Sequence, residues 1–368
     1  MTDKIITPPP ADYNKKFAIS QSAIKDWEGM SPKKWQEIWI LKSRQRPQAG
    51  AAASFGSLLD CLVFTPQHFD KRFVVSDIPL PSDSIRTVVS GVYNRIKELN
   101  ANAKKMNELN PGTTIPMKEL KLDHPDLIAT YAKEANYYVT QPTRAYNETI
   151  KNGSEYFEFL KRIDGKQAVS QADMDLAKKL CDILFTDKLV KGFFKPNKNC
   201  EVVFQQQIFA DLEVSGFENL DFLPLKGQLD DVYFNHKKKE VREIDLKWTM
   251  DAFLFKDSVK RFGYVKQHSF YDFLLREWLK TYRDGEFKDY SVANPLNVVI
   301  DSDEQVPYIY QYNGNDLHIE RYGHEHMHWF KGWEQTLYEI GWHMDTQQWD
   351  RPREHYLNGF MNVQQFKR

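Results

Sequence analysis

The sequence predicts an α/β protein, because helical patterns dominate its first half and strand patterns alternate with helices in its second half. Residues 123–193 are mostly helical in pattern, and 170–185 form the clearest amphipathic run. A long helix is predicted over 255–282, with Val259, Phe262, Phe270, Phe273 and Leu274 on one apolar stripe. The predicted strands cover 200–209, 227–234, 241–247 and parts of 291–312. This order of elements favours a sheet packed against helices.

The remaining segments suggest one large domain with additions at both ends. Residues 1–18 look like an extended arm, and Ser20 or Ser22 then caps a first helix. We expect one domain over 19–300, in which 76–118 is an inserted or peripheral segment, and an extension over 301–368 with a helix at 318–344.

Composition excludes several classes of protein. Apolar residues make up 41% of the 368 residues and aromatic residues 14%, which is enough for a globular core. The formal net charge of −1 provides no global attraction to nucleic acid, so such a partner would need a local basic cleft. Three cysteines without CxxC spacing suit a reducing cytoplasm. The sequence contains no apolar run of about 18 residues, so no membrane span is expected.

The stretch from 226 to 248 holds the strongest candidate site. If the hairpin is symmetric about Lys237 and Lys238, Asp230 lies opposite Asp245, where like charges would be destabilising unless a divalent cation lay between them. Lys247 projects from the same face of its strand as Asp245. Such a group suits metal-dependent phosphodiester hydrolysis, whereas the alternative is a solvated strand face with alternating charges.

Three further residues stand out by their positions in the predicted helices. Asp60 is the only charge in the apolar helix predicted over 55–64, so it either binds a partner or a metal or lies on the polar side of that helix. On the helix predicted over 255–282, Gln267 and Tyr271 are one turn apart on the flank of the apolar stripe.

The order of these motifs resembles the PD-(D/E)xK nuclease superfamily. Gly227-Gln-Leu-Asp230, Asp245-Leu-Lys247 and Gln267-His-Ser-Phe-Tyr271 are similar to the motifs of RecE-type phage and prophage exonucleases, which are related to the RecB nuclease domain and lambda exonuclease. The likeness runs from about residue 19 to about residue 285. It implies a central mixed β-sheet flanked by helices, a restriction-endonuclease-like core, with an α-helical N-terminal region.

The resemblance also implies roles for individual residues. Asp230, Asp245, the Leu246 carbonyl and Asp60 would bind Mg²⁺, with Mn²⁺ as an alternative, and Lys247 would activate the attacking water. Gln267 and Tyr271 would position the DNA strand and the lysine. Asp60 stands where this branch usually has a histidine, and Glu201 resembles an additional acidic residue of the family, with an exposed strand-end glutamate as its alternative.

The implied function is a metal-dependent exonuclease that resects double-stranded DNA from the 5′ end for phage-type recombination. Its partners would be DNA ends and a single-strand annealing protein in the cytoplasm of a bacterial host. Assembly into a homo-oligomer is left as an alternative to a monomer. The alternatives are an endonuclease of the same superfamily and an inactive nuclease-fold module that binds DNA or protein. The nucleic-acid contacts expected near the motifs are Lys226, Lys256, Lys260, Arg261 and Lys266.

Overall fold

The computed structural model describes Tyr13 and residues 16–44, 46, 51–110, 112, 114–163, 165–327 and 330–361. Most of the predicted arm at 1–18 lies outside these residues. The chain divides into two compact units, one formed by residues 1–47 and 180–368 and the other by residues 48–179. The predicted extension at 301–368 therefore belongs to the same unit as the motif-bearing strands.

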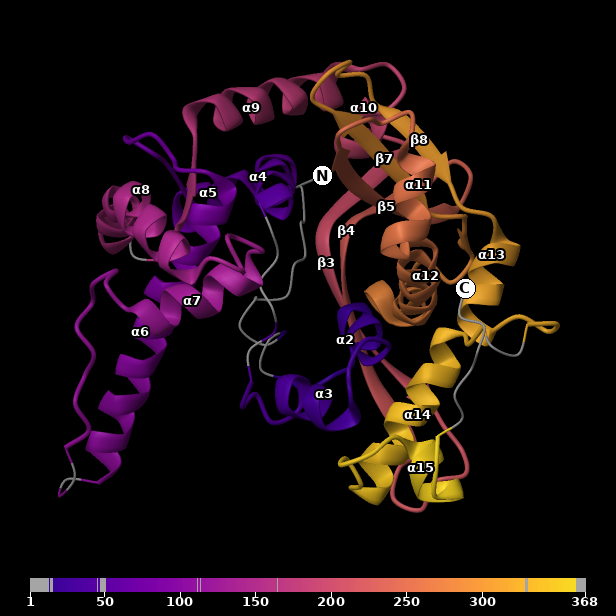
Figure 1. Ribbon diagram of the computed structural model, residues 1–368. Helices are drawn as coiled ribbons and strands as arrows, with labels where there is room; N and C mark the ends of the chain where they lie inside the picture. The colour runs from indigo at the N-terminus through magenta and orange to yellow at the C-terminus, as the bar shows by residue number, and fades with distance from the viewer. Residues whose placement is uncertain are drawn as a thin grey trace. The chain divides into compact units, whose positions relative to one another are not determined.

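The first unit contains a mixed sheet with the strand order β3-β4-β5-β7-β8 (Figure 1). Strands β3, β4 and β5 are antiparallel neighbours, β5 and β7 are parallel, and β7 and β8 are antiparallel. A short strand, β6, pairs with the start of β5. The strands are β3 Cys200–Glu213, β4 Phe222–Asn235, β5 Glu240–Thr249, β6 Ser291–Val292, β7 Leu296–Asp301 and β8 Tyr308–Gln311. The α/β prediction, with a mixed sheet and flanking helices, is confirmed at this level.

The hairpin of β4 and β5 has the predicted register. Asn235 pairs with Glu240 and Tyr233 pairs with Arg242, so the turn is centred between Lys237 and Lys238. The ladder between these two strands ends at Asp231 and Ile244. Beyond that pair, β4 continues to pair with β3, and β5 continues to pair with β7. The two strands therefore separate at the level of the next two residues, Asp230 and Asp245.

The long helix predicted over 255–282 is two helices, which corrects the sequence prediction. α11 covers Phe255–Phe262 and α12 covers Tyr264–Thr281, and Gly263 between them has φ of +69°. A left-handed residue cannot continue a right-handed helix, and glycine adopts this conformation without a steric penalty. The break removes Phe262 from the predicted stripe and leaves it 41% exposed, while Phe270 is buried.

Helix α12 packs closely on one face of the sheet. Phe270, Phe273 and Leu274 share a core with Leu229 and Val232 of β4. The approach depends on Gly227, because a Cβ atom there would lie 2.5 Å from Leu274 Cδ1 and 3.1 Å from Tyr271 Cε1. Glycine at this position therefore brings the helix that carries Gln267 and Tyr271 against the strand that carries Asp230.

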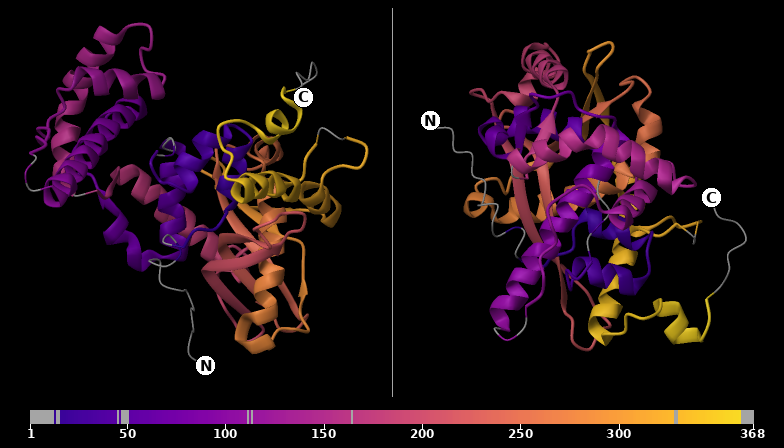
Figure 2. Two further views of the ribbon diagram at one scale, coloured as in Figure 1. Left: turned by 90° about the horizontal axis from the view of Figure 1, so that it is seen from below. Right: turned by 60° about the vertical axis from the view of Figure 1, so that its left-hand side comes forward.

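Shorter helices cover the rest of this unit. α2 (Gln21–Trp27) is capped by Ser20, whose hydroxyl accepts from Ala23 N at 3.3 Å, and it lies beside α14 (Figure 2). The predicted helix at 318–344 is two helices, because Gly323 ends the first one with φ of +94°. The other helices are α3 Pro32–Trp39, α10 Lys191–Phe194, α13 Gly314–Tyr322, α14 Trp333–Thr346 and α15 Arg353–Asn358.

The second unit is mainly helical. Val88, Val92 and Ile96 of α6 pack with Ile128 of α7 and Phe157 of α8 in a core of its own. The elements are α4 Ala51–Phe64, α5 Phe69–Arg72, β1 Phe73–Val75, α6 Asp83–Leu109, α7 Pro125–Glu134, α8 Pro142–Ile163, β2 Gln167–Val169 and the first part of α9 Gln171–Thr186. None of the helices that the structure describes, in either unit, has the length and apolar character needed to cross a bilayer.

Candidate active site

Asp245 is the centre of the candidate site. Its carboxylate is 2% exposed and accepts hydrogen bonds from three side chains on three elements. Gln267 Nε2 of α12 donates to Oδ1 at 2.8 Å, while Asn297 Nδ2 of β7 and Lys247 Nζ of β5 lie 2.7 Å and 2.5 Å from Oδ2. A carboxylate accepts about four hydrogen bonds, so one lone pair remains for another ligand.

Lys247 is held between acidic groups. Burial by itself lowers the pKa of an ammonium group, but the carboxylates of Asp245 and Asp230 and the hydrogen bond to Asp245 raise the pKa of Lys247 well above its ordinary value. The Nζ atom also lies 5.2 Å from the ring centroid of Tyr264. The side chain is mostly buried, and the neighbouring carboxylates keep its ammonium group charged.

Asp230 belongs to the same cluster, because its carboxylate raises the pKa of both Lys247 and Tyr271. Gln205 Nε2 of β3 donates to Asp230 Oδ1 at 3.2 Å. Burial, followed by the carboxylates of Asp230 and Asp245, raises the pKa of the Tyr271 hydroxyl well above its usual range. The structure therefore brings together Asp230, Asp245, Lys247, Gln267 and Tyr271, the residues that the sequence motifs predict.

A buried polar network behind Asp245 was not predicted from the sequence. Asn297 donates from Nδ2 to the carboxylate and, at 3.2 Å, to the backbone carbonyl of Asp245. Its Oδ1 accepts from the Tyr312 hydroxyl at 2.5 Å and lies 3.1 Å from His268 Nε2. His268 Nδ1 lies 2.9 Å from Glu243 Oε2. Asn297, His268 and Glu243 are each at most 1% exposed, so this network fixes the orientation of Asp245 from inside the core.

The only sequence signal for this network is a polar residue inside an apolar strand. Asn297 interrupts the run of β7, whose six residues are all buried. Burial by itself lowers the pKa of His268, but the Glu243 carboxylate beside it raises that pKa above its ordinary value. A buried polar side chain such as that of Asn297 needs a hydrogen-bond partner, and here the partner is the Asp245 carboxylate on the neighbouring strand β5.

The donor set fits Mg²⁺. Among the described residues, no group of three or more His, Cys, Asp and Glu side chains is placed to hold a metal ion. Mg²⁺ does not require such a cage, because it is commonly bound through one or two carboxylates, with water and substrate phosphates as the remaining ligands. Asp230, Asp245 and the carbonyl of Leu246, which lies between Asp245 and Lys247, supply hard oxygen atoms of this kind.

The other two predicted acidic residues lie on α4 and β3. Asp60 lies half-buried on α4 in the second unit, next to the buried Leu59 and Cys61, and its role as a ligand stays a prediction. Glu201 pairs with Phe234 at the start of β3, about 13 Å along the strand from Gln205 at ~3.3 Å per residue. Its carboxylate lies 3.8 Å from His236 Nε2 and accepts from the Tyr282 hydroxyl at 3.4 Å, and its catalytic role stays a prediction.

The five predicted DNA contacts fall into two groups. Lys226 donates to the backbone carbonyl groups of Tyr13 and Lys16, at 2.8 Å and 3.1 Å, and Lys266 forms an ion pair with Glu28. These two ammonium groups are engaged within the protein. The other three cations are exposed on α11, and no carboxylate of the described residues pairs with them: Lys256, Lys260 and Arg261.

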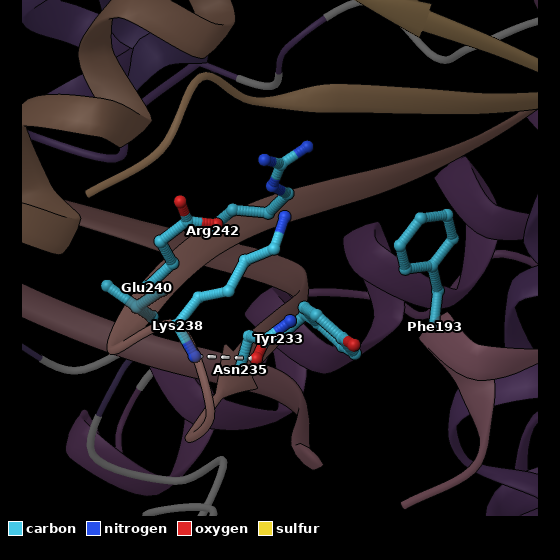
Figure 3. A pocket seen from close by; sticks show the side chains of 7 residues that line it. Phe193, Tyr233, Asn235, Lys238, Glu240 and Arg242 are labelled. Carbon is cyan, nitrogen blue, oxygen red and sulfur yellow. Dashed lines mark hydrogen bonds between the residues drawn. The ribbon is translucent and has the colours of Figure 1, made fainter. Parts of the chain in front are cut away.

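A separate pocket of about 170 Å³ lies at the turn end of the hairpin (Figure 3). Phe193, Tyr233, Lys238 and Arg242 are among its lining residues. Tyr233 and Arg242 are cross-strand partners two residues from the end of the ladder at Asp231 and Ile244. None of the predicted site residues lines this pocket, so it is distinct from the carboxylate cluster.

Comparison with models of known protein families finds no match for this chain, and comparison with characterised proteins finds none either. The chemistry of the carboxylate cluster is therefore the basis for assigning a function.

Proposed function

We propose that this protein is a Mg²⁺-dependent deoxyribonuclease, and specifically an exonuclease that hydrolyses double-stranded DNA from an end. The observation that carries the proposal is the contact of Asp245 with both Lys247 and Gln267 at the point where β4 and β5 separate. Two carboxylates, an ammonium group and an amide thus converge from two strands and a helix, as phosphodiester hydrolysis with a hard metal ion requires.

The same arrangement supports membership of the PD-(D/E)xK superfamily with a restriction-endonuclease-like core. The motif residues Gly227, Asp230 and Asp245 lie on two neighbouring strands, and Gln267 and Tyr271 lie on the helix that packs against them. Glycine at position 227 allows α12 to pack closely on β4, and Gln267 donates a hydrogen bond to Asp245. These contacts explain two parts of the motif.

Each residue of the cluster has a chemical role in this proposal. Asp230, Asp245 and the Leu246 carbonyl would hold Mg²⁺, which would polarise the phosphate and lower the pKa of a bound water. The Lys247 ammonium group, held 2.5 Å from Asp245, would stabilise negative charge on the phosphate and orient the attacking water. Gln267 holds the Asp245 carboxylate, and Tyr271 would contact the DNA strand.

The three exposed cations of α11 would bind the phosphate backbone. Because the net charge is only −1, affinity must come from such a local group, and each neutralised phosphate contributes about −0.9 to the slope of log K against log salt. Degradation from the 5′ end would leave a 3′ single strand for an annealing protein, as in phage-type recombination.

The first test replaces the cluster residues one at a time. Asp245→Asn and Lys247→Ala should each lower the rate of DNA hydrolysis about 100-fold or more, because each removes a charged group from the reacting centre. Asp289→Asn and Lys288→Ala, which change exposed residues of the same unit, are the matched controls and should hydrolyse DNA like the wild type. Rates within a few fold of wild type for either cluster variant would remove the proposed site.

The second test compares linear and covalently closed circular duplex DNA in Mg²⁺ and in EDTA. Mg²⁺-dependent loss of the linear duplex alone supports an exonuclease, and a 5′-phosphorylated end is the first substrate to try. Equal cleavage of both substrates would favour the endonuclease alternative. Binding without hydrolysis in Mg²⁺ or Mn²⁺ would favour the inactive module.

A further inference from the structure

The ladder between β3 and β4 is irregular at one pair of residues. Phe204 pairs with Asp231 and Gln206 pairs with Leu229, but the pair between them, Gln205 and Asp230, is missing from the ladder. Gln205 has φ of +51°, within the left-handed region. Residues other than glycine rarely adopt this conformation inside a strand, because the side chain crowds the backbone.

At this pair, both strands change which of their alternating side chains point toward α12. The β4 residues in the core shared with α12 have odd numbers up to Leu229 and even numbers from Val232 onward. On β3, Val203 and Ile208 belong to that same core although their positions differ by five, an odd number. A regular strand alternates its faces without interruption, so the irregular backbone at Gln205 and Asp230 reverses the direction of the side chains there.

The side chain of Gln205 connects this irregular backbone to the candidate site. Its Nε2 donates to Asp230 Oδ1 at 3.2 Å, and its Oε1 accepts from Gln228 Nε2. Gln228 therefore fixes the orientation of the amide so that its donor side faces the carboxylate. Asp230 receives from β3 the kind of support that Asp245 receives from Asn297 of β7.

We infer that Gln205 is a positioning residue that orients Asp230, and that its left-handed backbone is the cost of directing its amide at that carboxylate. This inference rests on the proposed function, in which Asp230 is a metal ligand. Strained conformations persist where the surrounding structure holds them, and here Gln228 and the paired strands do so.

The test separates backbone strain from the amide contact. Gln205→Gly relieves the strained conformation and removes the amide, so it should unfold at an equal or higher denaturant concentration than the wild type yet cleave DNA at least tenfold more slowly. Gln205→Asn tolerates the same backbone and has an amide one methylene shorter, so it should show an intermediate rate. Gln347→Gly is the matched control, because Gln347 is exposed at the end of α14 with φ of +56° and should keep the wild-type rate.

Metal binding gives a second readout that does not depend on turnover. Titration of the DNA-free protein with Mn²⁺, followed by electron paramagnetic resonance, should show affinity at least threefold weaker for Gln205→Gly than for the wild type or Gln347→Gly. A Gln205→Gly variant with wild-type cleavage and Mn²⁺ affinity would overturn the inference and leave the proposed function intact. A Gln205→Gly variant that unfolds more readily than the wild type would overturn the strained-backbone argument. A wild-type protein that neither cleaves DNA nor binds Mn²⁺ would overturn the proposed function, and this inference with it.

Discussion

The close contact between α12 and β4 at Gly227 makes the substitution Gly227→Ala a quantitative test of how the fold builds the site. The added Cβ atom would lie 2.5 Å from Leu274 Cδ1 and 3.1 Å from Tyr271 Cε1, both closer than ordinary van der Waals contact. Leu274 is fully buried, so it has no open space into which it can move. Overpacking of this kind typically lowers the free energy of unfolding by about 1–3 kcal/mol.

A double-mutant cycle assigns that loss to the contact. Leu274→Ala alone should lower the free energy of unfolding by about 2–5 kcal/mol through the cavity it leaves. In the double variant the new methyl group enters that cavity, so the combined loss should be smaller than the sum of the single losses by about 1 kcal/mol or more. The assay is urea unfolding followed by circular dichroism, with Gly192→Ala as control, because a Cβ atom at Gly192 meets nothing within 4 Å.

The same cycle applies to activity. If α12 is displaced from β4, Gln267 moves relative to Asp245, and a displacement of about 1 Å at a reacting centre can cost about 100-fold in rate. Additive effects of the two substitutions on stability, or a Gly227→Ala variant as stable as the Gly192→Ala control, would refute the argument that glycine is required for this approach.

Three further predictions concern single polar residues, namely Asn297, His343 and Asp60. Asn297→Leu removes the hydrogen bond to the charged Asp245 carboxylate and also the acceptor atom that Tyr312 and His268 contact. The free energy of unfolding, measured by urea titration, should therefore fall by about 3 kcal/mol or more. A loss below about 1 kcal/mol would contradict the network. Burial lowers the pKa of His343, so the folded state favours the neutral ring. The stability that this ring contributes is therefore complete above its ordinary pKa of about 6.5 and falls as the pH drops below that value. His343→Asn should weaken the dependence of stability on pH between about pH 7.5 and 5, and an identical dependence in the variant and the wild type would contradict this reasoning. If Asp60 is a metal ligand, Asp60→Ala should slow Mg²⁺-dependent hydrolysis strongly and Asp60→His should retain it, and an unchanged Mg²⁺ titration of Asp60→Ala would place Asp60 outside the site.

The sequence by itself determined the local parts of this protein. The alternation of apolar and polar residues about Lys237 and Lys238 gives the register of the β4–β5 hairpin, because a shift by one residue would turn every side chain to the wrong face. The spacing of Asp245 and Lys247 places both on one face of β5, and they do lie 2.5 Å apart. These features depend on neighbours within a few residues, which a short pattern specifies fully.

Only the tertiary structure decided the contacts that join distant segments. Asn297 reaches Asp245 because β7 runs parallel to β5, and the register of parallel strands is set by the crossover between them and not by the strand itself. Lys226 is engaged by the backbone of Tyr13 and Lys16, so its predicted DNA contact competes with bonds that no local pattern reveals. The left-handed backbone of Gln205 likewise depends on the pairing of its neighbours Phe204 and Gln206 with β4, because a glutamine alone favours the extended conformation of a strand. Local sequence patterns thus specify the charged residues of the candidate site. The amide side chains that orient them come from other strands, which only the tertiary structure places beside them.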